Sequence, residues 1–95
     1  SIGFLTPATK AVAIAPRGSD KHVELNIQTL RSREYPLPDE VYFYVRKDPG
    51  KPLDPKVTEF LRYVLSREGQ DAVQKDGKYL PLPARLVAEQ LKKLD

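Results

Sequence analysis

Apolar residues in the second half of the chain recur at intervals of three and four positions. The first such stripe comprises Val57, Phe60, Leu61, Val64 and Leu65. This spacing places apolar side chains on one face of an α-helix, where they can pack against a core. Asp54 is a typical N-cap residue, and proline is favoured at the first helical position that follows it. The pattern therefore predicts a helix that begins at Asp54.

A capping signal interrupts this stripe at Ser66, in the sequence Ser66-Arg67-Glu68-Gly69-Gln70. A serine hydroxyl can accept a hydrogen bond from a backbone N–H near Glu68 or Gly69, and an acidic residue is favourable in the first turn of a helix. We therefore expect a break at Ser66 and a second short helix that runs to about Lys75. Gly77 is suited to the left-handed conformation that often closes a helix.

A last helix is predicted from Ala84 to Leu94, after a proline-fixed extended segment at residues 79–83. Its apolar stripe comprises Ala84, Val87, Ala88, Leu91 and Leu94. Arg85 and Glu89 are four residues apart on the other side, a spacing that favours an ion pair on the helix surface.

The first half of the chain instead contains short apolar runs bounded by proline and glycine, which predict strands. Three runs fit: Ile2–Leu5, Ala11–Ala15 and Val41–Val45. The third is rich in β-branched and aromatic residues and is the strongest strand candidate. A short helix is expected within Val23–Ser32, with Asp20 as a possible cap. The fold class predicted is α/β, a mixed sheet of about three strands with three to four helices.

Composition limits the functional classes. The chain has 95 residues, enough for one domain at most, and a net charge of +3 with both signs interspersed. A nucleic-acid-binding surface would show an unbalanced basic cluster or a known motif, so we expect no nucleic-acid partner. The chain has no cysteine, which excludes disulfides and thiolate metal sites. It also has no methionine and opens on a strand-like stretch, which favours a segment of a longer protein.

No residue pattern indicates catalysis. His22 is the only histidine and has no second histidine or cysteine with which to form a metal site. Ser19 and Ser66 lack a nucleophile motif. Asp39 and Glu40 are adjacent, so in a strand they point to opposite faces and cannot act as a carboxylate pair. The aromatic residues Tyr42, Phe43 and Tyr44 could stack on a ligand but are equally favoured in any strand. We expect no catalytic residue, metal site or cofactor.

Three segments in this order resemble the end of phosphate-type solute-binding proteins, in the two-lobed periplasmic binding protein family. The first is Ile2-Gly3-Phe4, and the second is Tyr35-Pro36-Leu37 leading into Val41–Val45. The third and most specific joins Phe60 to Gln70 with Gly77-Lys78-Tyr79-Leu80-Pro81-Leu82. The resemblance covers nearly the whole chain, except for a loop at residues 17–24.

The resemblance implies that residues 1–95 form the C-terminal segment of a type 2 periplasmic-binding-protein domain, as a structural part of an ABC importer. The expected ligand of the whole protein is phosphate or a similar oxyanion, its partner is the membrane permease, and its location is periplasmic or extracytoplasmic. In such proteins the ligand-binding residues come from earlier in the chain, so none is expected here. Asp39-Glu40 departs from the family pattern, because two carboxylates near a cleft would oppose an anion.

Two further expectations follow from the residues. Strands such as Ala11–Ala15 and Val41–Val45 need both faces covered, so a segment cut from its parent should self-associate. The alternative function is a free-standing protein-interaction module that binds a partner through its apolar helix faces. An independent module should begin with a polar, capped residue, whereas this chain begins inside an apolar stretch.

Overall fold

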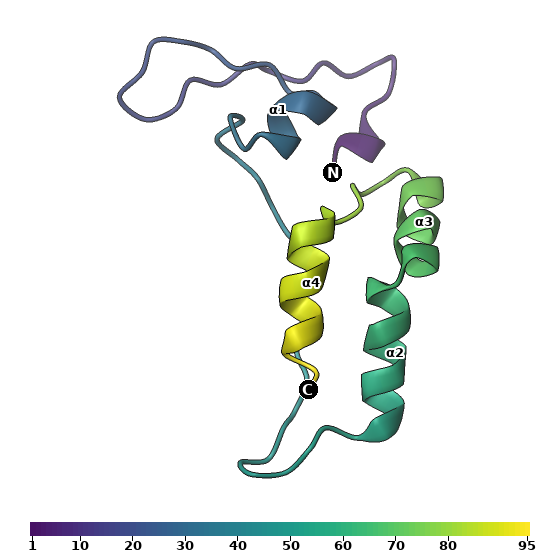
Figure 1. Ribbon diagram of the computed structural model, residues 1–95. Coiled ribbons are helices and arrows are strands. Elements are labelled where there is room, and N and C mark those ends of the chain that lie inside the picture. The colour runs from purple at the N-terminus through teal and green to yellow at the C-terminus, as the bar shows by residue number, and fades with distance from the viewer. The chain divides into compact units, whose positions relative to one another are not determined.

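The computed structural model describes all residues from Ser1 to Asp95 and divides them into two compact units. The first unit is Ser1–Tyr42 and the second is Phe43–Asp95. The first contains a 3-10 helix, η1 (Ile2–Phe4), and a short helix, α1 (Ile27–Arg31). The second contains helices α2 (Pro55–Leu65), α3 (Arg67–Asp76) and α4 (Ala84–Lys92) (Figure 1). None of these helices is both long and apolar enough to cross a membrane.

The predicted mixed sheet is wrong, because the chain has four α-helices and no strand. Ile2–Leu5 forms η1 instead of a strand. Ala11–Ala15 contributes only one antiparallel bridge, between Ile14 and Val23, with N···O distances of 3.0 and 2.9 Å. Val41–Val45 contains neither a helix nor a turn and belongs to no sheet. An extended segment becomes a strand only when a neighbouring segment supplies a ladder of hydrogen bonds, and residues 1–95 supply no such ladder.

In the first unit, α1 is shorter than the predicted helix and starts at a different cap. The N-cap is Asn26, not Asp20, and its Oδ1 accepts a hydrogen bond from the Thr29 backbone N–H at 2.8 Å. The Thr29 hydroxyl in turn accepts from the Asn26 backbone N–H at 3.1 Å, so two backbone donors are satisfied reciprocally. Tyr35 follows this helix and is the one buried hydrophobic residue of its unit.

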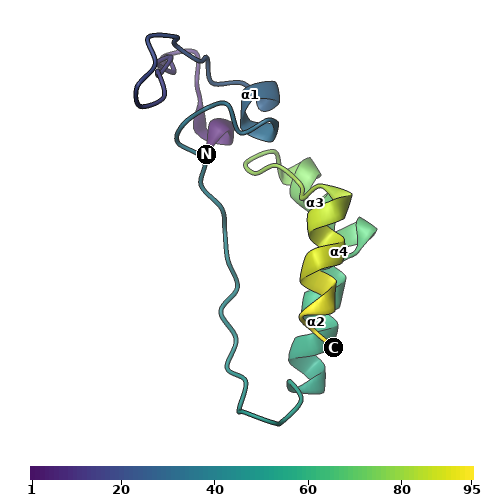
Figure 2. The same cartoon turned by 60° about the vertical axis from the view of Figure 1, so that its left-hand side comes forward.

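In the second unit, the predicted starts of α2, α3 and α4 and the break at Ser66 are confirmed, whereas α4 ends at Lys92, two residues before the predicted Leu94. The Asp54 carboxylate caps α2 by accepting from the Lys56 N–H at 2.8 Å. The Ser66 hydroxyl caps α3 by accepting from the Gly69 N–H at 3.1 Å. Gly77 closes α3 in the left-handed conformation, with φ of 74°. Helix α2 packs against both α3 and α4, and the two views show α4 alongside α2 (Figures 1 and 2).

The core of the second unit is built from Leu53 and Leu61, which are buried, as is the backbone of Gly69. In the predicted stripe of α2, Leu61 is buried and Val57, Val64 and Leu65 are half-buried, but Phe60 is exposed. On α4 the half-buried face is turned slightly from the predicted one, since Ala84 and Ala88 are exposed. This face comprises Leu86, Val87, Gln90 and Leu91. The predicted ion pair is confirmed, with Arg85 Nε 3.1 Å from Glu89 Oε1.

Replacing Ser66 with Ala should lower the free energy of unfolding by about 0.5–2 kcal/mol, because α3 loses its N-cap. The Ser66 hydroxyl also donates to the Tyr63 carbonyl at 2.6 Å, so the substitution loses two contacts at the α2–α3 junction. Ser32→Ala is the control, since the Ser32 hydroxyl makes only long contacts of 3.4 Å to Thr29 and Glu34. Equal urea midpoints for the two variants would contradict the capping role.

Candidate functional site

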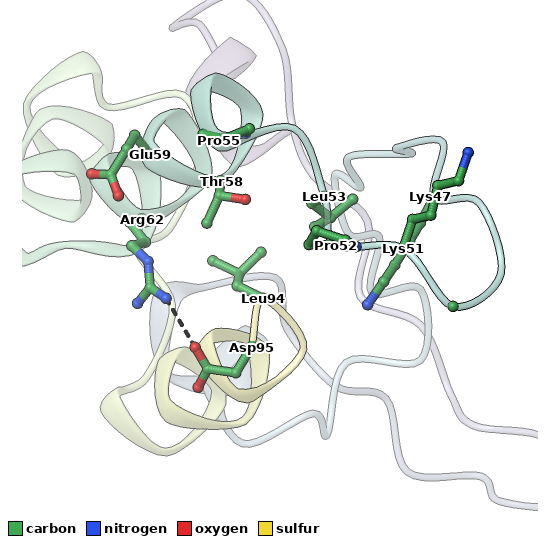
Figure 3. A pocket seen from close by; sticks show the side chains of 11 residues that line it. Lys47, Lys51, Pro52, Leu53, Pro55, Thr58, Glu59, Arg62, Leu94 and Asp95 are labelled. Atoms are coloured by element: carbon green, nitrogen blue, oxygen red, sulfur yellow. Dashed lines mark hydrogen bonds and ion pairs between the residues drawn. The ribbon is translucent and has the colours of Figure 1, made fainter.

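An open groove lined by apolar and charged residues lies in the second unit. It has a volume of about 600 Å³ and lies between the turn at residues 47–53, the first half of α2 and the end of the chain (Figure 3). Its apolar wall includes Pro52, Leu53, Pro55 and Leu94. The turn is closed by a hydrogen bond of 3.2 Å from the Lys51 N–H to the Asp48 carbonyl, with Gly50 at φ of 74°.

Two of the three cations that line the groove, Lys51 and Arg62, are paired with carboxylates. Arg62 Nη2 lies 2.9 Å from Asp95 Oδ1, which ties α2 to the end of the chain (Figure 3). Lys51 Nζ lies 3.7 Å from the Asp48 carboxylate. These pairs are largely exposed, and such ion pairs contribute about 0–1 kcal/mol each. Because carboxylates face two of its three cations, the positive charge that the groove offers to an anion is reduced.

The helix N-termini of the second unit also provide few donors for an anion. Asp54 occupies the start of α2 with its own carboxylate. At the start of α3, the Ser66 hydroxyl accepts one N–H and Glu68 adds a negative charge in the first turn. Helix α4 differs, because it begins after Pro83 with no side-chain cap, and this was not predicted. A helix start without a capping side chain leaves backbone N–H groups for water.

A glutamine that the sequence did not single out holds the α2–α3 junction together. Gln70 Nε2 donates to the Val64 carbonyl at 2.8 Å, at the end of α2. Gln70 Oε1 accepts from the Leu82 N–H at 2.7 Å, in the segment that precedes α4. One half-buried side chain thereby links three consecutive parts of the second unit. These contacts explain why the Ser-x-Glu-Gly-Gln sequence and the later Tyr-Leu-Pro-Leu sequence belong to one structural unit.

The carboxylate pair at residues 39 and 40 lies in the first unit and has local partners. Glu40 accepts hydrogen bonds from the Tyr42 hydroxyl at 2.9 Å and from the Arg33 guanidinium. The Tyr42 hydrogen bond, followed by the Arg33 hydrogen bond and charge, lowers the pKa of Glu40 below its ordinary value. Asp39 Oδ1 accepts from the Glu40 N–H at 2.9 Å. The charge of Glu40 is therefore compensated by Arg33, a contact that sequence spacing alone did not indicate.

The other candidate residues have structural surroundings. His22 is exposed, and no group of three His, Cys, Asp or Glu side chains is placed to hold a metal ion. Ser19 Oγ accepts from the Lys21 N–H at 3.1 Å in a turn. The aromatic residues Tyr42, Phe43 and Tyr44 are exposed, and the Phe43 ring meets Phe60 edge to face, with ring centroids 5.8 Å apart.

The chain is similar in sequence to known phosphate-binding proteins. No protein-family model matches the chain. The phosphate-binding proteins PstS of two Pseudomonas aeruginosa strains, PAO1 and UCBPP-PA14, are each 45% identical to it over 93 residues. The match covers 98% of this chain and 28% of each relative, so the chain spans just over a quarter of their length. The predicted resemblance is confirmed: the chain is PstS-like in sequence over almost its whole length.

Proposed function

We propose that the chain is the C-terminal segment of the solute-binding protein of an ABC importer for phosphate or a similar oxyanion. The observation that carries this proposal is the 45% identity over 93 residues to phosphate-binding proteins of which the chain spans 28%. In this proposal the segment is a scaffold rather than an enzyme. Its helices support a lobe, and the ligand contacts come from the remainder of the protein.

The exposed apolar residues of the second unit support a scaffold role. Phe60 and Tyr63 on α2 are more than half exposed, and before α4 Tyr79 is half exposed and Leu82 is 38% exposed. Such residues are normally covered in a finished domain, and a large exposed apolar surface marks a site of contact. A longer polypeptide would cover them by packing the rest of a lobe on these helices.

The partners and location follow from the same proposal. A solute-binding protein of this type delivers its ligand to a membrane permease, so the permease is the proposed partner and the periplasm or another extracytoplasmic space the proposed location. Self-association of the 95-residue chain is a separate proposal. The alternative function, a free-standing interaction module that uses its apolar helix faces, has no support from the comparisons.

The chain by itself should bind no phosphate. Two of the three cations of its groove face carboxylates, and Asp54 and Glu68 place negative charge at two helix starts. Calorimetry of the 95-residue chain should show no phosphate heat above dilution. A saturable one-to-one isotherm at micromolar phosphate would overturn the scaffold proposal and would point to the uncapped start of α4 as the first place to look.

A chimaera tests the transport assignment directly. In it, the matched 93 residues of a Pseudomonas aeruginosa PstS are replaced by residues of this chain. Because the segment supplies packing rather than ligand contacts, the chimaera should bind phosphate within about tenfold of the parent, a difference of about 1.4 kcal/mol. Unmodified PstS is the control. A folded chimaera that binds phosphate more than 100-fold more weakly would contradict the proposal.

A further inference from the structure

The segment that joins α3 to α4 ends in three residues with a single backbone donor (Figure 1). These residues are Pro81-Leu82-Pro83, here called the Pro-Leu-Pro strap. Proline has no backbone N–H and fixes its own φ, and it also keeps the residue before it extended. The strap is therefore stiff, and the position of the Leu82 N–H, its only backbone donor, determines the direction in which the chain enters α4.

The donor of the strap is bound by a side chain of α3. Gln70 Oε1 accepts from the Leu82 N–H at 2.7 Å, and Gln70 Nε2 donates to the Val64 carbonyl at 2.8 Å. Because a carbonyl only accepts and an N–H only donates, the two contacts fix which end of the amide faces the strap. The Val64 carbonyl is one of the last four of α2, which have no partner within their own helix. Gln70 thus satisfies an acceptor at the end of α2 and turns its own oxygen towards the strap.

Helix α4 has no side-chain cap with which to fix its own start. Its N-cap position is Pro83, and no side chain makes a capping hydrogen bond there. The Val87 N–H donates to the Pro83 carbonyl at 3.1 Å, so the first turn of α4 is built directly on the strap. The hydrogen bond between Leu82 and Gln70 lies one residue before this N-cap and anchors the start of α4 from another helix.

We propose that Gln70 is the positioning residue of α4 and makes the docking of α4 on α2 depend on the folding of α3. Gln70 is the fourth residue of α3, and its backbone N–H donates to the Ser66 carbonyl at 2.9 Å. Its side chain is therefore in place only when the first turn of α3 is formed. Helix α4 packs against α2 and not against α3, so the link from α3 to the start of α4 runs through Gln70. The proposal rests on contacts within the second unit and is independent of the proposed transport function.

Position 70 requires a side chain that donates at one end and accepts at the other. At neutral pH glutamate offers only acceptors and lysine only donors. Glutamate can therefore keep the contact with the Leu82 N–H and lose the one with the Val64 carbonyl, whereas lysine does the reverse. Leucine has a similar size and keeps neither contact. The three substitutions thus separate the hydrogen bond to the strap from the packing of the side chain.

Amide hydrogen exchange at neutral pH, followed residue by residue by NMR on the 95-residue chain, tests the proposal. Gln70→Leu and Gln70→Lys should speed exchange at Leu82 and throughout α4 by about five- to tenfold, the effect of losing one neutral hydrogen bond. Gln70→Glu keeps the acceptor and should stay within about twofold of the wild type, on the same reasoning. Gln74→Leu is the control, because it makes the same change at an exposed position of α3. It should leave exchange in α4 unchanged.

Removal of the donor tests the same contact without altering Gln70. Leu82→Pro removes the N–H and suits an extended position, whereas Leu82→Ala removes most of the side chain and keeps the N–H. Exchange in α4 should be about five- to tenfold faster in Leu82→Pro than in Leu82→Ala. Adding Gln70→Lys to Leu82→Pro should change exchange in α4 by less than about twofold, since the contact is already lost.

The dependence of α4 on α3 has its own test. Ser66→Ala weakens the start of α3 and should also speed exchange in α4. In the Gln70→Lys background the same substitution should speed exchange in α4 by less than half as much, because the link between the two helices is already broken. An effect of equal size in both backgrounds would contradict the dependence.

Three further outcomes would overturn the proposal. They are equal exchange in α4 for Gln70→Glu and Gln70→Lys, equal exchange in α4 for Leu82→Pro and Leu82→Ala, and an effect of Gln74→Leu as large as that of Gln70→Leu. The first two would show that packing on α2 alone positions α4. If the Gln70 variants fail to fold by their helical circular dichroism signal, the two Leu82 variants still decide.

Discussion

Leu61→Ala is expected to lower the free energy of unfolding of the second unit by about 2–4 kcal/mol. Leu61 is only 8% exposed and lies at the centre of the predicted stripe of α2, the helix that packs against both α3 and α4. Truncation removes buried methyl groups and leaves a cavity that three short helices can close only in part. The helical circular dichroism signal, followed through urea unfolding, measures the effect.

Leu82→Ala is the control for Leu61→Ala, because it makes the same substitution at a more exposed position of the same unit. Leu82 is 38% exposed, so the same change removes less apolar surface from a packed environment. Leu82→Ala should lower the free energy of unfolding by less than half as much as Leu61→Ala does. Equal costs at the two positions would show that Leu61 does not belong to a core, and that the three helices associate more loosely than the structure indicates.

Gly69→Ala is expected to destabilise the second unit by about 1–3 kcal/mol, although helix propensity alone favours it. Alanine in a helix interior is about 0.8–1 kcal/mol better than glycine. At Gly69, however, an added Cβ would lie 2.2 Å from the Tyr63 carbonyl oxygen and 2.7 Å from that of Val64. Both atoms belong to the backbone at the end of α2, so relief requires α2 and α3 to move apart.

The sign of the change in unfolding free energy of Gly69→Ala shows which effect is larger, the helix propensity of alanine or the clash between α3 and the end of α2. A variant that is more stable than the wild type would mean that α2 and α3 do not approach as closely as the structure shows. Gly50→Ala is the control: it has open space around its Cα but φ of 74°, so it introduces backbone strain without a clash. It should cost about 1–2 kcal/mol and leave the helical signal of the native state unchanged.

The α2–α3 junction contains the segment on which the resemblance to phosphate-type solute-binding proteins is most specific. Ser66 caps α3, Gly69 permits the close approach of the two helices, and Gln70 connects the end of α2 to Leu82. Each residue of this short sequence has a separate geometric role. A segment with this arrangement is specified locally, which is consistent with a role as scaffold and independent of any ligand.

The amino-acid sequence determined the helices of the second unit, because their signals are local. Asp54, Ser66 and Gly77 act on backbone groups within three residues of themselves, so periodicity and capping were enough to place α2 and α3. The sequence also determined the family resemblance. The absence of catalytic residues and of ligand-binding residues in this segment remains a prediction.

Tertiary structure decided whether extended segments became strands. Ala11–Ala15 and Val41–Val45 have strand-like composition, but a strand exists only where another segment pairs with it, and sequence composition carries no information about that partner. Contacts between residues far apart in the sequence were not predicted for the same reason, because sequence patterns do not identify the partner. Long-range contacts such as Gln70 with Leu82 and Arg62 with Asp95 join residues 12 and 33 positions apart, a separation that neither periodicity nor capping can detect.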